Sequence, residues 1–469
     1  MEYRDIKTLP ELAEFMRGQK VTVVGAGISN APLIEMLGDM GAELTIRDGA
    51  ERHKLPQRIQ SVSAVFVCGE SYLEGLEGLI FKSPGVKLLQ PAFETAMERG
   101  AVVTSEMELF FMLCPCKIIA ITGSDGKTTT TTLISKLLEA DGRTVHLGGN
   151  IGTPLLPRVG EMKPCDIAVI ELSSFQLQSM NTSRACDTAV VTNITPNHLD
   201  YHKSMQEYID AKTVIFANQS CEHRLILNAN NDITASFAET AKSSAELFSL
   251  ESKPDGIGMY LRDGIIVRTT PDGDEELLDT SELLLPGIHN TANFMAALSA
   301  VYPYIGNPAR AAHEVATTFK GVENRMELVL EQSDGVRYYN SSIDSSPTRT
   351  AAGLSGFKPS QPLIAIMGGY DKNLSNEPLI PVLFSQNVKN AVLTGTTGIK
   401  LRRDIEAHPE YASGKMKVIY EPLFDNAVRF AIELAAAGDY VVLSPASASF
   451  NAFKNFEERG RRFKELVLE

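Results

Sequence analysis

The stretch Ile118-Ile-Ala-Ile-Thr-Gly-Ser-Asp-Gly-Lys-Thr-Thr-Thr130 decides the fold of the central part of the chain. Its four leading apolar residues are typical of a buried strand, and the residues from Lys127 onward begin a helix. The glycines between them let the backbone approach phosphates, the helix N-terminus offers N–H groups, and Thr128 can reach Mg²⁺. The stretch predicts a nucleotide-triphosphate loop, although Ile121 stands where the common motif has its first glycine. An ordinary glycine turn before a helix is the alternative.

Composition limits the function classes. The chain has 469 residues, enough for about three domains, and its 43% hydrophobic and 22% charged residues are typical of a globular protein. Its net charge of −14 argues against a nucleic-acid-binding surface, which would be basic. There is no signal-peptide pattern and no apolar run of membrane-spanning length. We expect a cytoplasmic monomer that binds neither nucleic acid nor membrane.

The six cysteines are scattered, which is typical of reduced thiols. Cys114-Pro-Cys116 could suggest a redox or metal site. No second cluster of cysteine or histidine completes such a site, so we interpret the pair as two thiols at a domain junction.

The first segment, about residues 1–110, begins like a Rossmann fold. A strand at Val21–Val24 leads into Gly25-Ala-Gly27 and an apolar-periodic helix, and a second strand ends in Asp48. Asn30 stands where a third glycine would be, so dinucleotide binding is only weakly indicated. Lys82-Ser-Pro-Gly85 follows a later strand, and it is either a purely structural turn or another ligand-binding loop.

The second segment, about residues 111–320, contains the phosphate loop. A strand ends in the carboxylate of Glu171, where phosphate-loop enzymes place a metal-associated acid. Another strand is followed by Pro196-Asn-His198-Leu-Asp200, and a helix then carries Lys212. Residues 258–270, with Asp-Gly in the middle, predict a β-hairpin.

The third segment, about residues 321–469, again alternates strands and helices. Strands are expected near 335–340, 363–367, 391–394, 417–420 and 440–443. The sequence thus predicts an α/β protein of three domains: a Rossmann-like domain at 1–110, a central P-loop ATPase-type parallel sheet at 111–320 and a Rossmann-like domain at 321–469. Ligands are expected at the carboxyl ends of the strands.

Together these motifs resemble the Mur ligase family, which builds the peptide of bacterial peptidoglycan. In the family's order, the chain has Thr122-Gly-Ser-Asp-Gly-Lys-Thr-Thr129, Gly149-Asn-Ile-Gly152, Glu171-Leu-Ser-Ser-Phe-Gln-Leu177, His198-Leu-Asp200, Lys212, His289-Asn-Thr-Ala-Asn293 and Asn324-Arg-Met-Glu327. Glu171–Leu177 and Ser444-Pro-Ala-Ser-Ala-Ser449 resemble members that add D-glutamate to UDP-N-acetylmuramoyl-L-alanine. The His-His-Pro motif of L-alanine adders and the Asp-Asn-Pro-Arg motif of diaminopimelate and lysine adders are absent.

The resemblance implies an ATP-dependent amide ligase that works through an acyl phosphate. Its substrates would be UDP-N-acetylmuramoyl-L-alanine, D-glutamate and ATP, and Lys127, His198 and Lys212 would be catalytic. Two Mg²⁺ ions are expected, one at Thr128 and Glu171 and one at His198 and Lys212. In the family, the lysine is carbamylated by CO₂, so we expect Lys212 to carry an anionic carbamate.

The resemblance also implies three sets of binding residues. ATP would contact Gly123, Ser124, Asp125, Gly126, Lys127, Thr128 and Thr129, with Asn290 and Asn293 at the adenine and Arg325 at the ribose or phosphates. The UDP-sugar would contact Gly25, Ile28, Ser29, Asp48, Ser83 and Asn150. D-glutamate would contact Ser345, Lys372, Ser449, Phe450 and Phe456. We expect the third domain to close over ATP.

One loop departs from the family pattern. Where members commonly have Asn-Asp-Ser-Lys-Ala-Thr, this chain has Asn340-Ser-Ser-Ile-Asp-Ser345. Ser341 replaces an acid expected near the ATP ribose, Ile343 replaces a lysine, and Asp344 compensates only if the loop is reshaped.

Three alternative functions are compatible with parts of the sequence. A folylpolyglutamate-type or other Mur-type ligase shares the phosphate loop, but the folylpolyglutamate enzymes lack a UDP-binding domain. A nicotinamide-dependent oxidoreductase built on Gly25-Ala-Gly27 leaves the phosphate loop, Glu171 and Lys212 unexplained. A catalytically inactive UDP-sugar-binding scaffold has only Ser341 in its favour.

Overall fold

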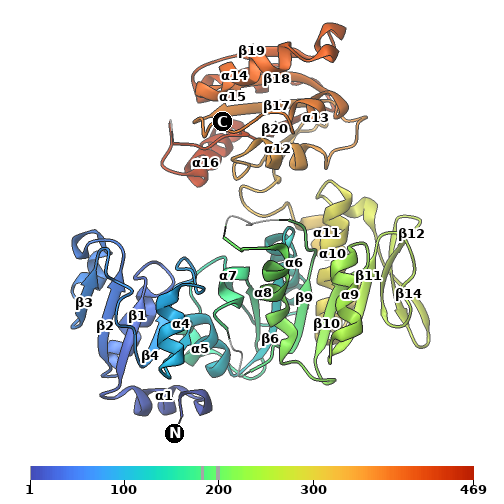
Figure 1. Cartoon of the computed structure of the whole chain (residues 1–469). Helices are drawn as coiled ribbons and strands as arrows, with labels where there is room; N and C mark the ends of the chain where they lie inside the picture. The colour runs from blue at the N-terminus through green and yellow to red at the C-terminus, as the bar shows by residue number, and fades with distance from the viewer. Residues whose placement is uncertain (1, 181–183, 197–200, 451) are drawn as a thin grey trace. The chain divides into compact units, whose positions relative to one another are not determined.

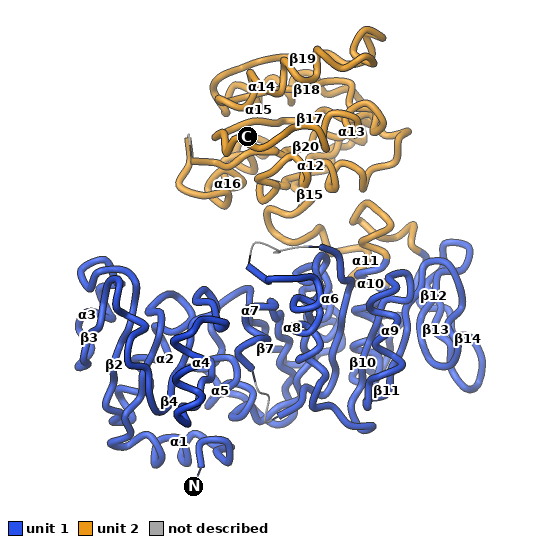
Figure 2. The backbone as a smooth tube through the Cα atoms, viewed as in Figure 1, with its two compact units in different colours: residues 1–279, 292–312 blue, residues 280–291, 313–469 orange. Residues whose placement is uncertain are grey.

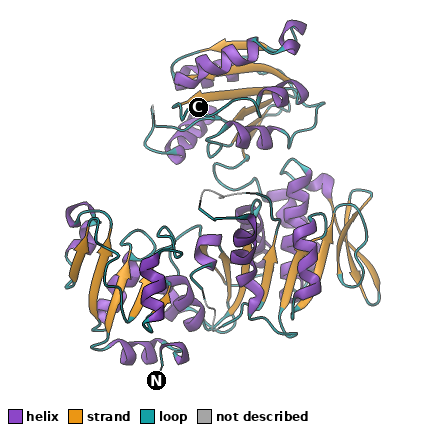
Figure 3. Cartoon of the chain, in the orientation of Figure 1, coloured by secondary structure: helices purple, strands orange, loops and turns teal. Residues whose placement is uncertain are grey.

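The structure, a computed structural model, describes residues 2–180, 184–196, 201–450 and 452–469. The chain forms two compact units, Met1–Asp279 with Ala292–Ala312, and Thr280–Thr291 with His313–Glu469 (Figure 2). Three β-sheets follow one another along the sequence, each flanked by helices (Figures 1 and 3). This arrangement confirms the predicted α/β fold class. None of the helices in the described part of the chain is long and apolar enough to cross a membrane.

The first sheet is parallel and has the strand order β3-β2-β1-β4-β5. Its strands are β1 (Lys20–Val24), β2 (Glu43–Asp48), β3 (Val65–Cys68), β4 (Leu79–Lys82) and β5 (Val102–Thr104). The helices are α1 (Leu9–Met16), α2 (Ala31–Asp39), α3 (Gln57–Gln60), α4 (Pro91–Glu98) and α5 (Glu106–Leu113). The strand order reverses between β1 and β4, and this is the point where ligands bind in such sheets.

The second sheet has nine strands in the order β14-β13-β12-β11-β10-β9-β6-β8-β7. They are β6 (Lys117–Thr122), β7 (Val145–Gly149), β8 (Ile167–Glu171), β9 (Thr188–Val191), β10 (Arg224–Asn228), β11 (Ser244–Ser249), β12 (Gly258–Arg262), β13 (Ile265–Thr270) and β14 (Gly273–Asp279). The central sheet is therefore parallel except at one edge, where β12, β13 and β14 pair antiparallel. The predicted hairpin is confirmed: Asp263 (φ 50°) and Gly264 (φ 84°) form its two-residue turn, as a type I′ turn requires.

Helices α6 (Lys127–Ala140), α7 (Ser174–Leu177), α8 (Met205–Ala217), α9 (Asp232–Thr240), α10 (Ile288–Val301) and α11 (Pro308–Thr318) follow the strands of this segment. The boundary between the two compact units falls inside α10 and again inside α11. Strands β6, β8 and β9 are buried along almost their whole length, because helices cover the sheet.

The third sheet has the order β15-β16-β20-β17-β18-β19. Its strands are β15 (Glu327–Glu331), β16 (Arg337–Asn340), β17 (Leu363–Gly369), β18 (Val388–Thr394), β19 (Lys417–Tyr420) and β20 (Tyr440–Leu443), and its helices are α12 (Pro347–Leu354), α13 (Ile380–Ser385), α14 (Gly395–Glu406), α15 (Phe424–Glu433) and α16 (Phe456–Leu468). All five predicted strands are present. The antiparallel edge strand β15 was not predicted. Two apolar clusters occupy the two faces of the sheet.

Candidate active site

The phosphate loop connects the end of β6 to the start of α6. Gly123 (φ 149°) and Gly126 (φ 78°) both have positive φ. A Cβ atom on Gly123 would lie 1.9 Å from Thr192 Oγ1, and one on Gly126 would lie 2.3 Å from Asn293 Oδ1. Only glycine fits at either position, so the predicted tight strand–loop–helix turn is confirmed.

The loop is anchored from the segment that follows β9 and from α8. The N–H groups of Ser124 and Asp125 donate to the carbonyl and the side chain of Asn193, at 2.8 and 2.9 Å. The hydroxyls of Ser124 and Tyr208 lie 3.0 Å apart. The first intrahelical bond of α6 runs from the N–H of Thr130 to the carbonyl of Gly126. The N–H groups at the N-terminus of a helix have no acceptor inside that helix, and such groups commonly bind anions.

Two lysine amines lie against this loop. Lys127 Nζ donates to the carbonyls of Gly123 and Ser124, both at 2.9 Å. Lys212 Nζ, on α8, donates to the same Gly123 carbonyl at 2.7 Å and to Thr122 Oγ1 at 3.4 Å. The structure thus brings together two of the three predicted catalytic residues. The third, His198, lies outside the described residues.

Lys212 is almost completely buried, with 2% of its surface exposed. Burial, and secondarily the positive charge of Lys127, lowers its pKa from 10.5 to about 6. At neutral pH, the Lys212 amine is therefore mostly uncharged and nucleophilic.

Glu171 lies at the carboxyl end of β8, next to β6, and is 1% exposed. Its Oε1 atom accepts a hydrogen bond from Asn150 Nδ2 at 2.8 Å. Its Oε2 atom is buried, and no group in the described part of the chain donates to it. A buried carboxylate oxygen without a donor costs free energy unless a cation is bound, so this position fits Mg²⁺. Thr128, the second residue of α6, lies at the same edge of the sheet, after β6.

The loop after β1 holds three of the six predicted UDP-sugar residues, Gly25, Ile28 and Ser29. Gly25 has φ 87°, and a Cβ atom there would lie 2.6 Å from Ser83 Cβ, so the loops after β1 and β4 approach closely. Ile28 is 83% exposed and Ser29 is partly buried. Asp48 accepts from the N–H groups of Ala26 and Ala50, both at 2.8 Å, so in this structure it supports the loop.

Asn30 replaces the third glycine of a dinucleotide fingerprint. Its Nδ2 atom donates to the carbonyls of Gly25 at 2.9 Å and Val24 at 3.4 Å. The amide therefore ties the loop together internally, and the side chain is buried.

Sequence reasoning missed a small cavity of about 20 Å³ beside this loop. It is lined by Ser29, Pro84, Ser105, Glu106, Met107, Gly149, Pro154 and Gln176. Gln176 lies inside the Glu171–Leu177 motif, so the sequence did contain a signal for a functional role of Gln176. No sequence motif indicated Glu106, because its position in the cavity depends on how α5 packs against other segments.

Sequence reasoning also missed the burial of Lys82. Its amine donates to the carbonyls of Ser83 and Val86, at 2.9 and 2.6 Å, and burial lowers its pKa to about 8. The loop after β4 is therefore held by a buried amine.

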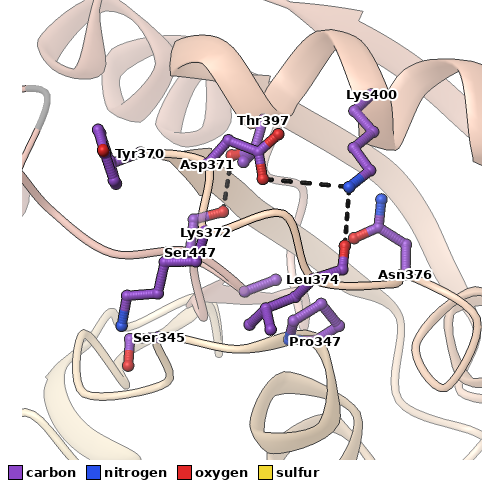
Figure 4. A pocket seen from close by; sticks show the side chains of 11 residues that line it. Ser345, Pro347, Tyr370, Asp371, Lys372, Leu374, Asn376, Thr397, Lys400 and Ser447 are labelled. Atoms are coloured by element: carbon purple, nitrogen blue, oxygen red, sulfur yellow. Dashed lines mark hydrogen bonds and ion pairs between the residues drawn. The ribbon is translucent and has the colours of Figure 1, made fainter.

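In the second unit, a cavity of about 10 Å³ brings Ser345 and Lys372 together (Figure 4). Its other lining residues are Pro347, Tyr370, Asp371, Leu374, Asn376, Thr397, Lys400, Ala446 and Ser447. Sequence reasoning missed Lys400, whose Nζ donates to the Leu374 carbonyl at 2.8 Å and pairs with Asp371 at 4.0 Å.

The other three predicted glutamate residues do not line that cavity. Ser449 is buried, and the exposed ring of Phe450 lies edge-on to Tyr370. Phe456 begins α16, and its carbonyl accepts a hydrogen bond from Ser342 Oγ.

The residues predicted at the adenine, Asn290 and Asn293, and at the ribose or phosphates, Arg325, belong to different units. Asn293 lies in the first unit, where its Oδ1 atom accepts from Thr130 Oγ1 at 3.3 Å, beside Gly126. Asn290 and Arg325 lie in the second unit, and Asn290 Nδ2 donates to the Pro286 carbonyl.

The loop that departs from the family pattern is well bonded. Ser341 Oγ accepts from the N–H of Met326 at 3.2 Å. Asp344 accepts from Ser444 Oγ at 2.9 Å, and burial raises the pKa of its carboxyl group. Asp344 lies three residues after Ser341, the replaced acid position, and its N–H donates to the Ser341 carbonyl at 3.0 Å. The side chain of Asp344 therefore bonds within its own unit.

Two family domains match this chain. Residues 121–301 match the Mur ligase middle domain, and residues 324–447 match the Mur ligase glutamate ligase domain. Among solved structures, a UDP-N-acetylmuramoyl-L-alanyl-D-glutamate–2,6-diaminopimelate ligase superposes with a TM-score of 0.57 at 16% identity, over 97% of this chain and 93% of that one. The UDP-N-acetylmuramate-alanine ligase of Thermotoga maritima gives 0.56 at 16% identity, over 96% and 99%. These superpositions support the fold alone.

Sequence relatives are much closer. The UDP-N-acetylmuramoylalanine–D-glutamate ligase of Acetivibrio thermocellus is 46% identical, over 98% of both chains. The ligase of the same name from Clostridium novyi is 44% identical, over 98% of this chain and 99% of the relative. The fold and the phosphate loop define a nucleotide-binding α/β protein. With these matches, the chain belongs to the Mur ligase family.

Proposed function

We propose that the protein adds D-glutamate to UDP-N-acetylmuramoyl-L-alanine at the expense of ATP, in the synthesis of peptidoglycan precursors. The observation that carries the proposal is the meeting of Lys127, Lys212 and Glu171 at one edge of the central sheet. The names of relatives with 40–46% identity along almost the whole chain support the choice of substrates.

The first step joins two anions. An oxygen of the alanyl carboxylate attacks the γ-phosphorus of ATP, the bond to the β-phosphate oxygen breaks, and ADP leaves. Such a transfer depends on positioning and charge neutralisation. The N–H groups at the start of α6 and the Lys127 amine would hold the phosphates, after Lys127 gives up its bonds to the loop carbonyls.

Mg²⁺ would neutralise charge on the phosphate oxygens. Thr128 and Glu171 would hold one ion, since the unpartnered Oε2 atom of Glu171 suits a hard cation. A second ion would be held by His198 and a carbamate on Lys212.

The neutral Lys212 amine favours this carbamate. Its nitrogen would form a bond to the carbon of CO₂ and lose one proton to solvent, which leaves an anionic carboxylate-type ligand. An ordinary charged lysine could not react in this way, and the lowered pKa of about 6 supports the assignment.

The second step forms the amide. The D-glutamate amine attacks the acyl phosphate carbon, loses a proton, and phosphate leaves. Ser345 and Lys372 would hold a glutamate carboxylate in the cavity of Figure 4, since that ligand needs a cation and hydrogen-bond donors. Ser449, Phe450 and Phe456 stay proposals for the remaining contacts.

The test offers ATP, Mg²⁺ and UDP-N-acetylmuramoyl-L-alanine with single amino acids, and follows phosphate release and product mass. We expect release to depend on D-glutamate. Release driven best by L-alanine, L-lysine or diaminopimelate would contradict the substrate assignment and favour another Mur-type ligase. Release with a folate substrate would favour a folylpolyglutamate-type ligase.

A further inference from the structure

The cavity beside the Gly25–Asn30 loop contains a carboxyl group that the proposed mechanism does not use. Glu106 is the first residue of α5 and is 6% exposed. Its Oε1 atom is buried, and no group in residues 2–180, 184–196, 201–450 or 452–469 bonds to it. A buried polar atom of this kind is costly unless a ligand or water satisfies it. The cavity volume of about 20 Å³ admits one group of the size of a water molecule.

The residues around Glu106 connect it with the proposed UDP-sugar site. Ser29 lies in the loop after β1, and Gly149 precedes Asn150. Gln176 lies in the short helix after Glu171, and its Oε1 atom accepts from the N–H and hydroxyl of Ser173. Its amide nitrogen is therefore the end of the side chain that suits a ligand oxygen.

The charges near Glu106 favour its neutral form. No other charged side chain lines the cavity in the described part of the chain. Burial raises the pKa of Glu106 to about 7, and the Leu156 N–H opposes this shift only in part. On the 3-10 helix that packs against α5 (Leu156–Glu161), Arg158 and Glu161 pair with each other. On α5 itself, Glu108 accepts from Thr104 Oγ1.

Two further elements carry charges. On α2, Glu35 pairs with Arg58 at 3.7 Å, and Asp39 is near the helix end. The loop after β4, which contributes Pro84 to the cavity, is held by the Lys82 amine. A bound diphosphate at the Ser29 loop would bring more negative charge and so favour the protonated carboxyl further.

We propose that Glu106 is a substrate-binding and specificity residue for the UDP-sugar: its protonated carboxyl group donates its O–H to a substrate oxygen that enters this cavity. The inference rests on the proposed function, since it takes UDP-N-acetylmuramoyl-L-alanine as the ligand. A carboxylate that instead accepted from a sugar hydroxyl would show the opposite pH dependence.

The test measures Kd for UDP-N-acetylmuramoyl-L-alanine by calorimetry between pH 6 and 8, in the full-length protein. If only the protonated form binds and its pKa is about 7, Kd should rise about tenfold across this range. Glu106→Gln keeps a neutral donor of the same shape, so its Kd should stay within about threefold of the wild-type value at pH 6. Lys82 titrates in both the wild type and Glu106→Gln, so the difference between the pH profiles of their Kd values reports on Glu106.

Two variants complete the test. Glu106→Ala should raise Kd about tenfold at pH 6, and Glu108→Gln, a buried glutamate on the same helix outside the cavity, should keep the wild-type pH profile. Equal pH profiles for wild type and Glu106→Gln, or tighter wild-type binding at higher pH, would overturn the inference. If the wild-type enzyme turns over the substrate but its pH profile does not differ from that of Glu106→Gln in the expected way, only the inference about Glu106 is wrong. If wild type binds no UDP-sugar, the proposed function falls as well.

Discussion

Two loops of the first unit, Gly25–Asn30 and Gly123–Lys127, connect a parallel strand to a helix in the same way. Each contains a glycine with positive φ. A Cβ atom added to that glycine would clash with a neighbour, Ser83 in the case of Gly25 and Asn293 in the case of Gly126. Both backbones can therefore come close to a phosphate.

The loops differ in charge. The amines of Lys127 and Lys212 both donate to the Gly123 carbonyl, whereas Gly25–Asn30 contains no basic residue and is closed by the Asn30 amide. We infer that the first-sheet loop only holds its ligand, while the second must neutralise a phosphate that reacts.

The largest effect is expected for Lys212→Met, which should lower kcat at least about 10⁴-fold because the proposed metal ligand is lost. The same change should stabilise the folded protein by about 1–3 kcal/mol at pH 7, since it removes a desolvated amine. In wild type, the unfolded chain binds the Lys212 proton between pH 6 and 10.5 and the folded chain does not. Wild-type stability therefore rises with pH in this window, and the advantage of the variant shrinks.

Urea unfolding at several pH values, in CO₂-depleted buffer with a chelator, measures the stability part. The control is Lys136→Met, which replaces an exposed lysine on α6. This variant should show neither the loss of kcat nor the gain in stability. An active Lys212→Met enzyme would remove Lys212 from the proposed mechanism.

Lys127→Met should lower kcat about 10³-fold, because a cation aimed at the transferred phosphate is lost. Calorimetry should find the Kd for the UDP-sugar within about twofold of wild type, since the first loop has its own contacts. If Lys127→Met lowered kcat and weakened UDP-sugar binding by the same factor, the two loops would not act separately.

Gly126→Ala should raise the KM for ATP about 10–100-fold, because the new Cβ would meet Asn293 Oδ1 at 2.3 Å and displace the loop. Gly142 provides a matched control: it has the same φ of 78°, with no atom within 4 Å of an added Cβ. Gly25→Ala should instead raise the Kd for the UDP-sugar and leave ATP unaffected. If Gly126→Ala and Gly142→Ala behave alike in steady-state kinetics, close packing at Gly126 is unimportant.

Asn30→Gly restores the third glycine and should have the smallest effect. The loss of the bond from Nδ2 to the Gly25 carbonyl should lower the free energy of unfolding by about 1–2 kcal/mol, measured in urea. The Kd for the UDP-sugar should rise only about threefold. Binding of a nicotinamide dinucleotide by this variant or by wild type would contradict the interpretation of the first sheet.

Local patterns made much of this structure predictable. Strand β6, the glycines after it and the β12–β13 hairpin follow from apolar runs and turn residues that interact within a few positions. The edge strand β15 was missed because it is short and only one of its five residues is fully buried. Its place depends on pairing with β16.

The site was predictable where a motif carried it, as for Lys127, Glu171 and Lys212. Glu106 and Lys400 were missed because their neighbours come from distant segments, which the sequence does not bring together by any local rule. Asp48 accepts hydrogen bonds from the N–H groups of Ala26 and Ala50, a supporting role in the loop that its position at the end of a strand does not indicate. The roles of these residues toward ligands stay predictions.

The central claim is that ATP activates the alanyl carboxylate as an acyl phosphate before D-glutamate attacks. The most direct measurement uses UDP-N-acetylmuramoyl-L-alanine with ¹⁸O in both carboxylate oxygens and determines the mass of the released phosphate. We expect one ¹⁸O atom in each phosphate and one in the new amide. Phosphate without ¹⁸O, released while the amide forms, would contradict it.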